Sequence, residues 1–308
     1  MQLKTSEGGE RRSPGSNAVA LALSMALATA PLMFADPAYA RSAPDGFADL
    51  IESVSPAVVQ ITTRQSAAGK SAHGNGDLSQ IPEQFREGPM RDFFERFFRE
   101  GVPGDLPEQQ AERTALGSGF IISSEGTVVT NNHVIGDADK MEVTLKDGSR
   151  FPARLIGSDE KTDLAVIKID ADRTLPTVAW GDSDHSRVGD WVVAVGNPFG
   201  LAGTATAGIV SSRGRDIGAG PYDDFIQIDA PINTGNSGGP LFNGDGGVIG
   251  VNTAIYSPSG GSVGIGFAIP SNAARKVVAE LQEKGTVNRG WLGVAIQPVT
   301  RKWQKALA

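Results

Sequence analysis

The sequence predicts an all-β protein built from two β-barrels. Short runs of alternating apolar and polar residues recur from residue 117 onward, and turn residues separate them at close intervals. Strands this short and closely spaced are typical of sandwiches and barrels rather than of βαβ units. A polar joint near residues 170–174 interrupts the pattern, which then starts afresh. Two sets of strands on either side of a joint therefore favour two barrels.

The first set of strands contains one clear hairpin. Apolar and polar residues alternate over residues 141–145 and 151–155, and Asp147-Gly148 lies between the two runs. An Asp-Gly pair in this position is a strong hairpin signal, because the turn that joins two twisted strands needs a positive φ. The other elements predicted in this set are a helix over residues 46–54 and strands at residues 57–63, 119–122, 127–130 and 164–169.

The second set of strands ends in a helix. Its strands are predicted at residues 191–195, 204–212, 225–228, 248–253 and 263–269. The helix follows, with Ser271 as its N-cap and Gly285 as the residue that stops it. Apolar residues recur between them at helical spacing, so one face of the helix is expected to be buried.

Residues 64–113 differ from the rest of the chain. They are rich in Gly, Ser, Gln, Glu and Pro and show little periodicity, which predicts a long inserted loop on the surface. Residues 92–100 include four phenylalanines that would share one face of a helical turn. This helix either folds back on its own domain or offers an aromatic contact on an exposed arm.

Residues 1–40 are predicted to be a secretory signal peptide. Basic residues precede an apolar run over residues 18–35, and small residues at Ala38 and Ala40 predict cleavage after Ala40. A retained membrane anchor is the alternative, but the run is short for a span and Pro31 interrupts it. The mature protein is therefore expected to be exported and to keep no stable membrane span.

The composition argues against several classes of function. The formal net charge of −7 is spread along the chain, so nucleic acid is not expected as a partner. The chain has no cysteine, which excludes disulfides and thiol catalysis. It has three histidines, of which His73 and His185 lie in polar segments, so no metal site is predicted. No phosphate-binding glycine loop is recognisable, and neither ATP nor any cofactor is expected.

Ser237 is the candidate nucleophile. It lies between Gly235-Asn236 and Gly238-Gly239, shortly after an apolar strand. A serine hydroxyl is a poor nucleophile until a base takes its proton and N–H donors await the oxyanion. Glycines on both sides let the backbone turn sharply, so that amides and hydroxyl can converge on one carbonyl. A glycine-rich hairpin turn is the alternative, so the chemistry requires a base and an acid elsewhere.

His133 and Asp163 are the candidate base and acid. His133 follows the strand at residues 127–130, where it can face a cleft, and its pKa suits proton transfer near neutrality. Asp163 directly precedes the apolar strand at residues 164–169, where a carboxylate is expected to be partly buried and hydrogen-bonded. Taken alone, either residue fits an ordinary cap or turn. Together with Ser237, they follow the order and logic of the chymotrypsin triad.

Four stretches resemble the HtrA family of DegP-like periplasmic serine endoproteases. They are residues 130–135, 161–169, 196–201 and 229–241. The resemblance implies a chymotrypsin-like fold, in which two six-stranded antiparallel β-barrels pack together and a helix follows them. It also implies a protease domain over residues 41–286 and the N-terminal fragment of a PDZ domain over residues 287–308.

The resemblance assigns roles to the candidate residues. Ser237 would attack the peptide carbonyl, and His133 would take its proton and return it to the leaving amine. Asp163 would fix the tautomer of the imidazole and stabilise its charged form. The backbone N–H groups of Gly235 and Ser237 would form the oxyanion hole.

The resemblance also implies residues for specificity and regulation. Ile232, Ile255 and Tyr256 match positions that line the S1 pocket, which implies small aliphatic P1 residues, although both isoleucines also fit a plain core role. Arg215 matches the arginine of the family's sensor loop, which implies a regulatory role. The alternative is that Arg215 is an ordinary solvated cation on a loop. Asn236, directly before the serine, is neutral and cannot form an ion pair with an amino terminus newly produced by cleavage. We therefore expect activation by loop rearrangement rather than by cleavage of the chain.

The whole resemblance implies an ATP-independent serine endopeptidase for unfolded or misfolded exported proteins, which acts in periplasmic quality control under stress. A holdase-type chaperone on the same scaffold is the alternative, and a peptide-binding adaptor without catalysis is disfavoured because the triad is whole. The family also implies a homotrimer or larger homo-oligomer, with aromatic residues near the mature N-terminus, such as Phe47, as contacts.

Overall fold

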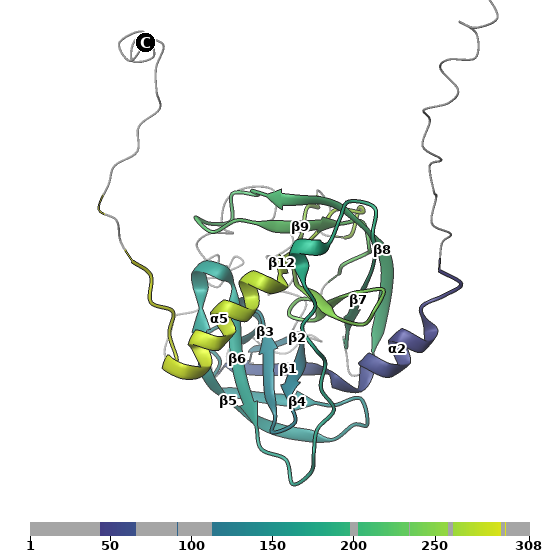
Figure 1. The fold of residues 1–308 in the computed structure, drawn as a ribbon. Helices are drawn as coiled ribbons and strands as arrows, with labels where there is room; N and C mark the ends of the chain where they lie inside the picture. Colours follow the sequence, from purple (N-terminus) through teal and green to yellow (C-terminus); the bar gives the residue numbers. More distant parts are fainter. Residues whose placement is uncertain are drawn as a thin grey trace, which may run out of the picture. The chain divides into compact units, whose positions relative to one another are not determined.

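The computed structural model describes residues 44–65, 91, 113–197, 203–233, 235–257, 261–290 and 293 (Figure 1). One compact unit begins at Gly46 and contains all of them except Pro44 and Asp45. The signal peptide, the phenylalanine-rich stretch 92–100 and most of the tail 287–308 lie outside the described residues, so these remain predictions. Within the described ranges, no helix combines the length and apolar character needed to span a bilayer.

The first barrel is a closed antiparallel sheet of six strands. Helix α2 (Ala48–Val54) and the 3-10 turn η2 (Ser55–Ala57) lead into it. Neighbouring strands follow the order β1 (Val58–Gln65), β2 (Arg113–Ser123), β3 (Thr127–Thr130), β6 (Leu164–Ile169), β5 (Arg150–Asp159) and β4 (Lys140–Thr144), and β4 pairs with β1. The hairpin predicted around Asp147-Gly148 is the β4–β5 pair. Closure of the sheet leaves no unpaired edge strand.

The second barrel repeats the strand order of the first. Its neighbouring strands are β7 (Trp191–Gly196), β8 (Thr204–Arg215), β9 (Phe225–Ile228), β12 (Gly266–Pro270), β11 (Val248–Ile255) and β10 (Pro240–Asn243), and β10 pairs with β7. The two sheets confirm the prediction of an all-β fold of two six-stranded antiparallel barrels.

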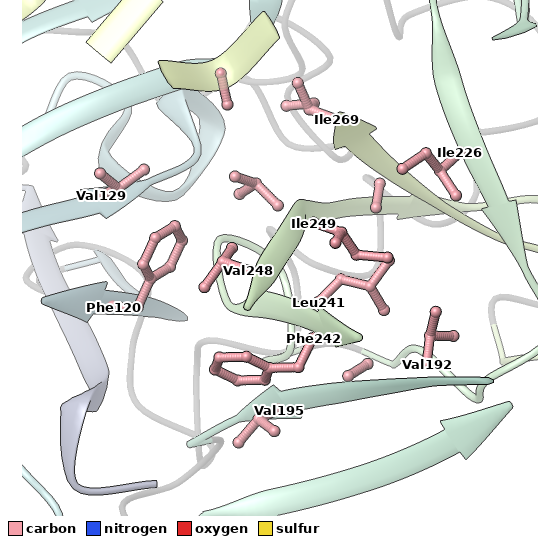
Figure 2. Close-up of a cluster of buried hydrophobic side chains, with 14 of the residues drawn as sticks. Phe120, Val129, Val192, Val195, Ile226, Leu241, Phe242, Val248, Ile249 and Ile269 are labelled. Carbon is pink, nitrogen blue, oxygen red and sulfur yellow. The ribbon is translucent and has the colours of Figure 1, made fainter. Parts of the chain in front are cut away.

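The central strands of the first barrel are buried on both faces. Phe120 pairs with Val129, and both belong to a cluster that includes Val248 of the second barrel (Figure 2). Their neighbours Ile121 and Val128 also pair, and they belong to the core of the first barrel. Because successive side chains on a strand point to opposite faces, one strand pair serves both the barrel core and the contact between barrels.

The C-terminal helix α5 (Ser271–Lys284) contacts β5 and β6 of the first barrel and β11 and β12 of the second (Figure 1). Its buried apolar side chains are Ala274, Val278 and Leu281. Gly285 ends the helix with φ 73°, as predicted. The prediction that Ser271 is the N-cap is wrong. The helix begins at Ser271, so Pro270 is the N-cap, and the hydroxyl of Ser271 donates to the carbonyl of Gly181 at 2.9 Å.

Several strands differ from the prediction. Strand β2 begins at Arg113 rather than at residue 119, and residues 64, 65 and 113 belong to the paired strands β1 and β2 rather than to the predicted inserted loop 64–113. Strand β10 was not predicted, because its four residues adjoin the glycine-rich turn and become a strand only by pairing with β7 and β11. Strand β12 begins at Gly266 rather than at residue 263. Strand β8 continues through Arg215, which pairs with Phe225 of β9. Long-range pairing decided each of these boundaries.

Candidate active site

Asp163 occupies a strained turn directly before β6. It follows the 3-10 turn η5 (Glu160–Thr162) with φ 55° and ψ 39°, and it is the one non-glycine residue with positive φ in the described part of the chain. Its carbonyl accepts hydrogen bonds from the N–H of Asn132 at 3.1 Å and from Nδ2 of Asn131 at 2.8 Å. Backbone strain persists where surrounding contacts hold it, and such positions cluster at functional sites.

His133 lies in the short helix α4 (Asn132–Ile135) and contacts Asp163 twice. Its Nδ1 lies 2.7 Å from Oδ2 of the carboxylate, and its backbone N–H donates to Oδ1 at 3.0 Å. Because a carboxylate only accepts, Nδ1 carries a proton, and Nε2 of the neutral ring is the atom that can accept one. Both side chains are buried. Asp163 therefore fixes the orientation and the tautomer of the His133 imidazole.

Ser237 lies in a turn that backbone contacts hold from both barrels. Its carbonyl accepts from the N–H of Ser118 in β2 at 2.9 Å. The N–H of Gly238 donates to the carbonyl of Asn252 in β11 at 2.8 Å. Ser237 is fully buried. The backbone on the C-terminal side of the candidate nucleophile is thus held by hydrogen bonds to a strand of each barrel.

Gly238 approaches the first barrel too closely for any side chain. Its φ is +83°, and a Cβ added to it would lie 2.3 Å from the carbonyl oxygen of Ser118 and 2.3 Å from Oγ1 of Thr130. Both the backbone conformation and the lack of space demand glycine. The sharp turn predicted from the sequence is therefore also a point of close approach between the serine turn and the first barrel.

Asn131 joins the acid to the serine across the two barrels. Its Nδ2 donates to the carbonyl of Asp163 at 2.8 Å and to Oγ1 of Thr253 in β11 at 3.0 Å. The carbonyl of Thr253 accepts from the hydroxyl of Ser237 at 3.3 Å. The three predicted catalytic side chains are therefore linked at the junction of the barrels. Sequence reasoning missed Asn131 and Thr253, and only the closeness of Asn131 to His133 along the chain pointed to either.

The hydroxyl of Ser237 is directed at the carbonyl of Thr253 in this structure. A hydroxyl has a single proton, so the serine must leave this contact before it can donate to a base. The contact is weak, because O–H···O hydrogen bonds are usually no longer than about 3.0 Å. A rotation of the serine side chain is the step that this geometry requires before proton transfer.

The residues predicted to line the substrate pocket differ in exposure. Ile232 and Ile255 are fully buried in the core of the second barrel. Gly266 of β12 lies against Ile232. A Cβ added to Gly266 would lie 3.0 Å from the side chain of Ile232. Tyr256 is 40% exposed. Of the three predicted residues, Tyr256 is the one that offers surface to solvent.

Tyr256 shares a pocket with Arg215. The pocket has a volume of about 480 Å³, and its lining residues are Arg215, Asp216, Ile217, Gln227, Tyr256, Ile265 and Phe267. Arg215 ends β8, and its Nε donates to Oε1 of Gln227 at 2.8 Å. A predicted sensor arginine and a predicted specificity residue therefore line the same pocket.

His185 lies on the surface, as its polar sequence context indicated. Its Nδ1 lies 2.7 Å from the carboxylate of Asp182, which also accepts from Nδ2 of Asn272 at 2.7 Å. The hydrogen bond from Asn272 is the main reason that the pKa of Asp182 is lowered to about 2, with further contributions from the N–H of Asp184 and from His185. His73 lies outside the described residues.

A second charged pair lies shortly before Asp163 in the sequence. Asp159 accepts from the N–H of Thr162 at 3.1 Å and forms two hydrogen bonds with the guanidinium of Arg289, which also lies 4.5 Å from the ring centre of Tyr222. Burial raises the pKa of Asp159, but the hydrogen bonds from Arg289 and Thr162 outweigh it and hold the pKa below its usual value. The pair ties the segment after α5 to the turn that carries the acid.

Two six-stranded barrels with a histidine, an aspartate and a serine at their junction define a protein of the trypsin-like serine peptidase class. The family described as trypsin-like peptidase domain matches residues 117–251. The structure of the HtrA-type protease AlgW with a decapeptide is 41% identical, with a TM-score of 0.66, and the match covers 85% of this chain and 75% of that one. The chain belongs to the HtrA family of serine proteases.

Curated relatives agree with this assignment. A protein of Bartonella henselae named probable periplasmic serine endoprotease DegP-like is 54% identical over 265 residues, which cover 83% of this chain and 52% of the relative. A protein of the same name from Brucella suis biovar 1 is 56% identical over 274 residues, which cover 83% of this chain and 53% of the relative. The chain thus spans about half the length of the curated relatives it matches.

Proposed function

We propose that this protein is a serine endopeptidase that cleaves unfolded or misfolded exported proteins in the periplasm without ATP, as part of quality control under stress. The observation that supports the proposal is a set of contacts that joins the three residues: His133 bonds to the carboxylate of Asp163, the Asp163 carbonyl bonds to Asn131, Asn131 bonds to the Thr253 hydroxyl, and the Thr253 carbonyl accepts from Ser237. It unites a base, the acid that orients it and a serine, which are the parts that acyl transfer by a serine requires.

The mechanism follows from the chemistry of these groups. Ser237 attacks the substrate carbonyl while Nε2 of His133 takes the hydroxyl proton. Asp163 stabilises the resulting imidazolium through Nδ1, 2.7 Å from its carboxylate. The N–H groups of Gly235 and Ser237 stabilise the oxyanion of the tetrahedral intermediate. The C–N bond then breaks as His133 returns the proton to the leaving amine, and water releases the acyl group by the same route.

We assign substrate selection to Ile232, Ile255 and Tyr256. None of these side chains is charged and the two isoleucines are apolar, so a substrate pocket that they line favours valine or alanine over lysine or arginine at P1. The two isoleucines are buried in this structure, so substrate entry requires the loop before the nucleophile to move. Arg215, on the pocket beside Tyr256, is the residue that we assign to control of that movement.

We also propose that the protein forms a homotrimer through its N-terminal aromatic residues. The ring of Phe47 lies 5.8 Å from that of Trp191, which is 40% exposed, and Val188 nearby in the sequence is 65% exposed. Apolar surface of this kind is typical of protein contacts. Light scattering should give a mass near three chains for the wild type and a lower mass for Phe47→Ala, and an unchanged mass would contradict this contact.

One experiment tests the catalytic proposal. A serine-directed fluorophosphonate should label the protein at Ser237, and Ser237→Ala should lower casein cleavage about a millionfold. Ser53→Ala is the control, because Ser53 is exposed on α2 and its hydroxyl donates to the carbonyl of Leu50. Near-normal cleavage by pure Ser237→Ala protein would refute the proposal. A protein that bound unfolded chains but was not labelled would be a holdase instead.

A further inference from the structure

Ser118 stands out among the buried polar residues of the first barrel. It lies on β2 and is fully buried. Its hydroxyl donates to the carbonyl of Gly235 at 2.5 Å and accepts from the N–H of Asn197 at 2.8 Å. One hydroxyl thus joins the turn that carries the nucleophile to the residue that follows β7, and its donor and acceptor capacities are both used.

The backbone of Ser118 reinforces this contact. Its N–H donates to the carbonyl of Ser237 at 2.9 Å, and its carbonyl accepts from Oγ1 of Thr130 at 2.7 Å. Ser118 therefore holds the nucleophile turn at Gly235 through its side chain and at Ser237 through its main chain. These two residues are the ones whose N–H groups form the oxyanion hole in the mechanism proposed above.

We propose that Ser118 is a positioning residue that holds the oxyanion hole in its working geometry, an inference that rests on the proposed function. The hydroxyl fixes the carbonyl of Gly235, and the N–H of the same peptide group donates to the carbonyl of Asn233 at 3.1 Å. A peptide group is planar, so bonds at both ends fix its orientation. This peptide lies between the two N–H donors, and its rotation would turn them away from a common point.

The packing around Ser118 leaves little room to replace its hydroxyl. A Cβ added to Gly196 would lie 2.4 Å from Oδ1 of Asn236 and 3.0 Å from Oγ of Ser118. An alanine at this position supplies neither a donor nor an acceptor in place of the hydroxyl. Removal of the hydroxyl would therefore leave the Gly235 carbonyl and the Asn197 N–H without this partner.

Ser118→Ala in the full chain tests the proposal. We expect kcat on a chromogenic peptide to fall by about 10- to 100-fold, because mispositioned donors lose part of the stabilisation that an oxyanion-hole donor supplies. KM should stay within about threefold of the wild type, because ground-state binding does not use the oxyanion donors. A peptide boronate, which forms a tetrahedral adduct at the serine, should bind more weakly by about the factor lost in kcat/KM.

Ser271→Ala is the matched control. Ser271 is also a buried serine whose hydroxyl donates to a distant backbone carbonyl, that of Gly181, but it lies at the start of α5. Its loss should lower the melting temperature and leave kcat unchanged. If Ser118→Ala keeps the wild-type kcat per labelled active site and only loses thermal stability, as Ser271→Ala does, the positioning role is refuted.

A second variant covers the case in which Ser118→Ala does not fold. Ser118→Cys keeps a group of similar shape, but its S–H is a weak donor. We therefore expect kcat to fall while KM stays unchanged. An unchanged kcat would overturn the proposal. Ser237→Ala, run alongside, separates the two levels of the argument. Activity that survives Ser237→Ala refutes the catalytic proposal itself, whereas inactive Ser237→Ala with fully active Ser118→Cys refutes only the role of Ser118.

Discussion

Asp163 holds His133 through both of its carboxylate oxygens, one on the ring nitrogen Nδ1 at 2.7 Å and one on the backbone N–H at 3.0 Å. The second contact fixes the start of helix α4, from which the imidazole projects. The first makes Nδ1 the protonated nitrogen, because a carboxylate can only accept. One buried side chain therefore sets both the position and the protonation pattern of the imidazole.

Asp163→Asn tests this dual role. The amide can donate to Nδ1 through its NH₂ group and so favours the wrong tautomer, while its shape preserves the packing. We expect kcat to fall by about 10⁴-fold with the fold intact, as measured by peptide hydrolysis and circular dichroism. A loss of less than about tenfold would show that the carboxylate does not set the tautomer.

Asn131→Ala tests the link between the barrels. The amide of Asn131 bonds to the Asp163 carbonyl and to Oγ1 of Thr253. Its removal lets the acid and the serine turn shift relative to each other, and a misplacement of about 1 Å can cost about 100-fold in rate. Peptide hydrolysis should show a loss of this order. Asn272→Ala, which removes a surface hydrogen bond to Asp182, should leave kcat unchanged and is the control.

Gly238→Ala tests the close approach of the serine turn to the first barrel. The new Cβ would lie 2.3 Å from the Ser118 carbonyl oxygen in a backbone conformation with φ +83°. Gly148→Ala is the matched control for Gly238→Ala. Gly148 has nearly the same φ, +84°, but no atom lies within 4 Å of a Cβ added to it. Gly148→Ala should cost about 1 kcal/mol of unfolding free energy, from backbone strain alone. Gly238→Ala should cost more and abolish labelling of Ser237, and equal effects would contradict the steric argument.

Asp159 makes stability depend on acid pH. Its pKa is lower in the folded protein than in the unfolded chain, where it is about 4, so the stabilisation is fully present above pH 4 and is lost as the pH falls through the folded value. Asp159→Asn should lower the free energy of unfolding at pH 7 by about 1–3 kcal/mol, the usual worth of hydrogen bonds to a charged group. Thermal melts below pH 4 should show this difference shrinking.

The control for the pH experiment is Asp245→Asn, because Asp245 is exposed. Its melting curves should follow those of the wild type across the same range. If Asp159→Asn loses stability equally at pH 7 and well below pH 4, the pair with Arg289 does not act through the charge of the carboxylate.

Residue chemistry and order were enough to select the three triad candidates, because a base, an acid and a flexible serine turn are each readable locally. The same reasoning could not find Asn131, Thr253 or Ser118. Ser118 and Thr253 lie on strands and Asn131 directly follows one, and polar residues in such places normally face solvent. Apart from the closeness of Asn131 to His133, nothing in their neighbourhoods along the chain shows that they are buried. The assignment of Ser271 as the helix cap was wrong by one residue, because α5 begins at Ser271 and Pro270 precedes it. The contact of the Ser271 hydroxyl with Gly181, from another part of the chain, was equally invisible to local reasoning.

The sequence by itself determined the class of fold and the kind of chemistry, because strand alternation, turn residues and reactive side chains are properties of short stretches. Only the tertiary structure decided how the barrels close, which polar groups meet between them and where the serine turn is held. Ser118 and Gly235 are 117 residues apart along the chain. A contact of that range exists only after both sheets have closed and packed, so no local pattern encodes it.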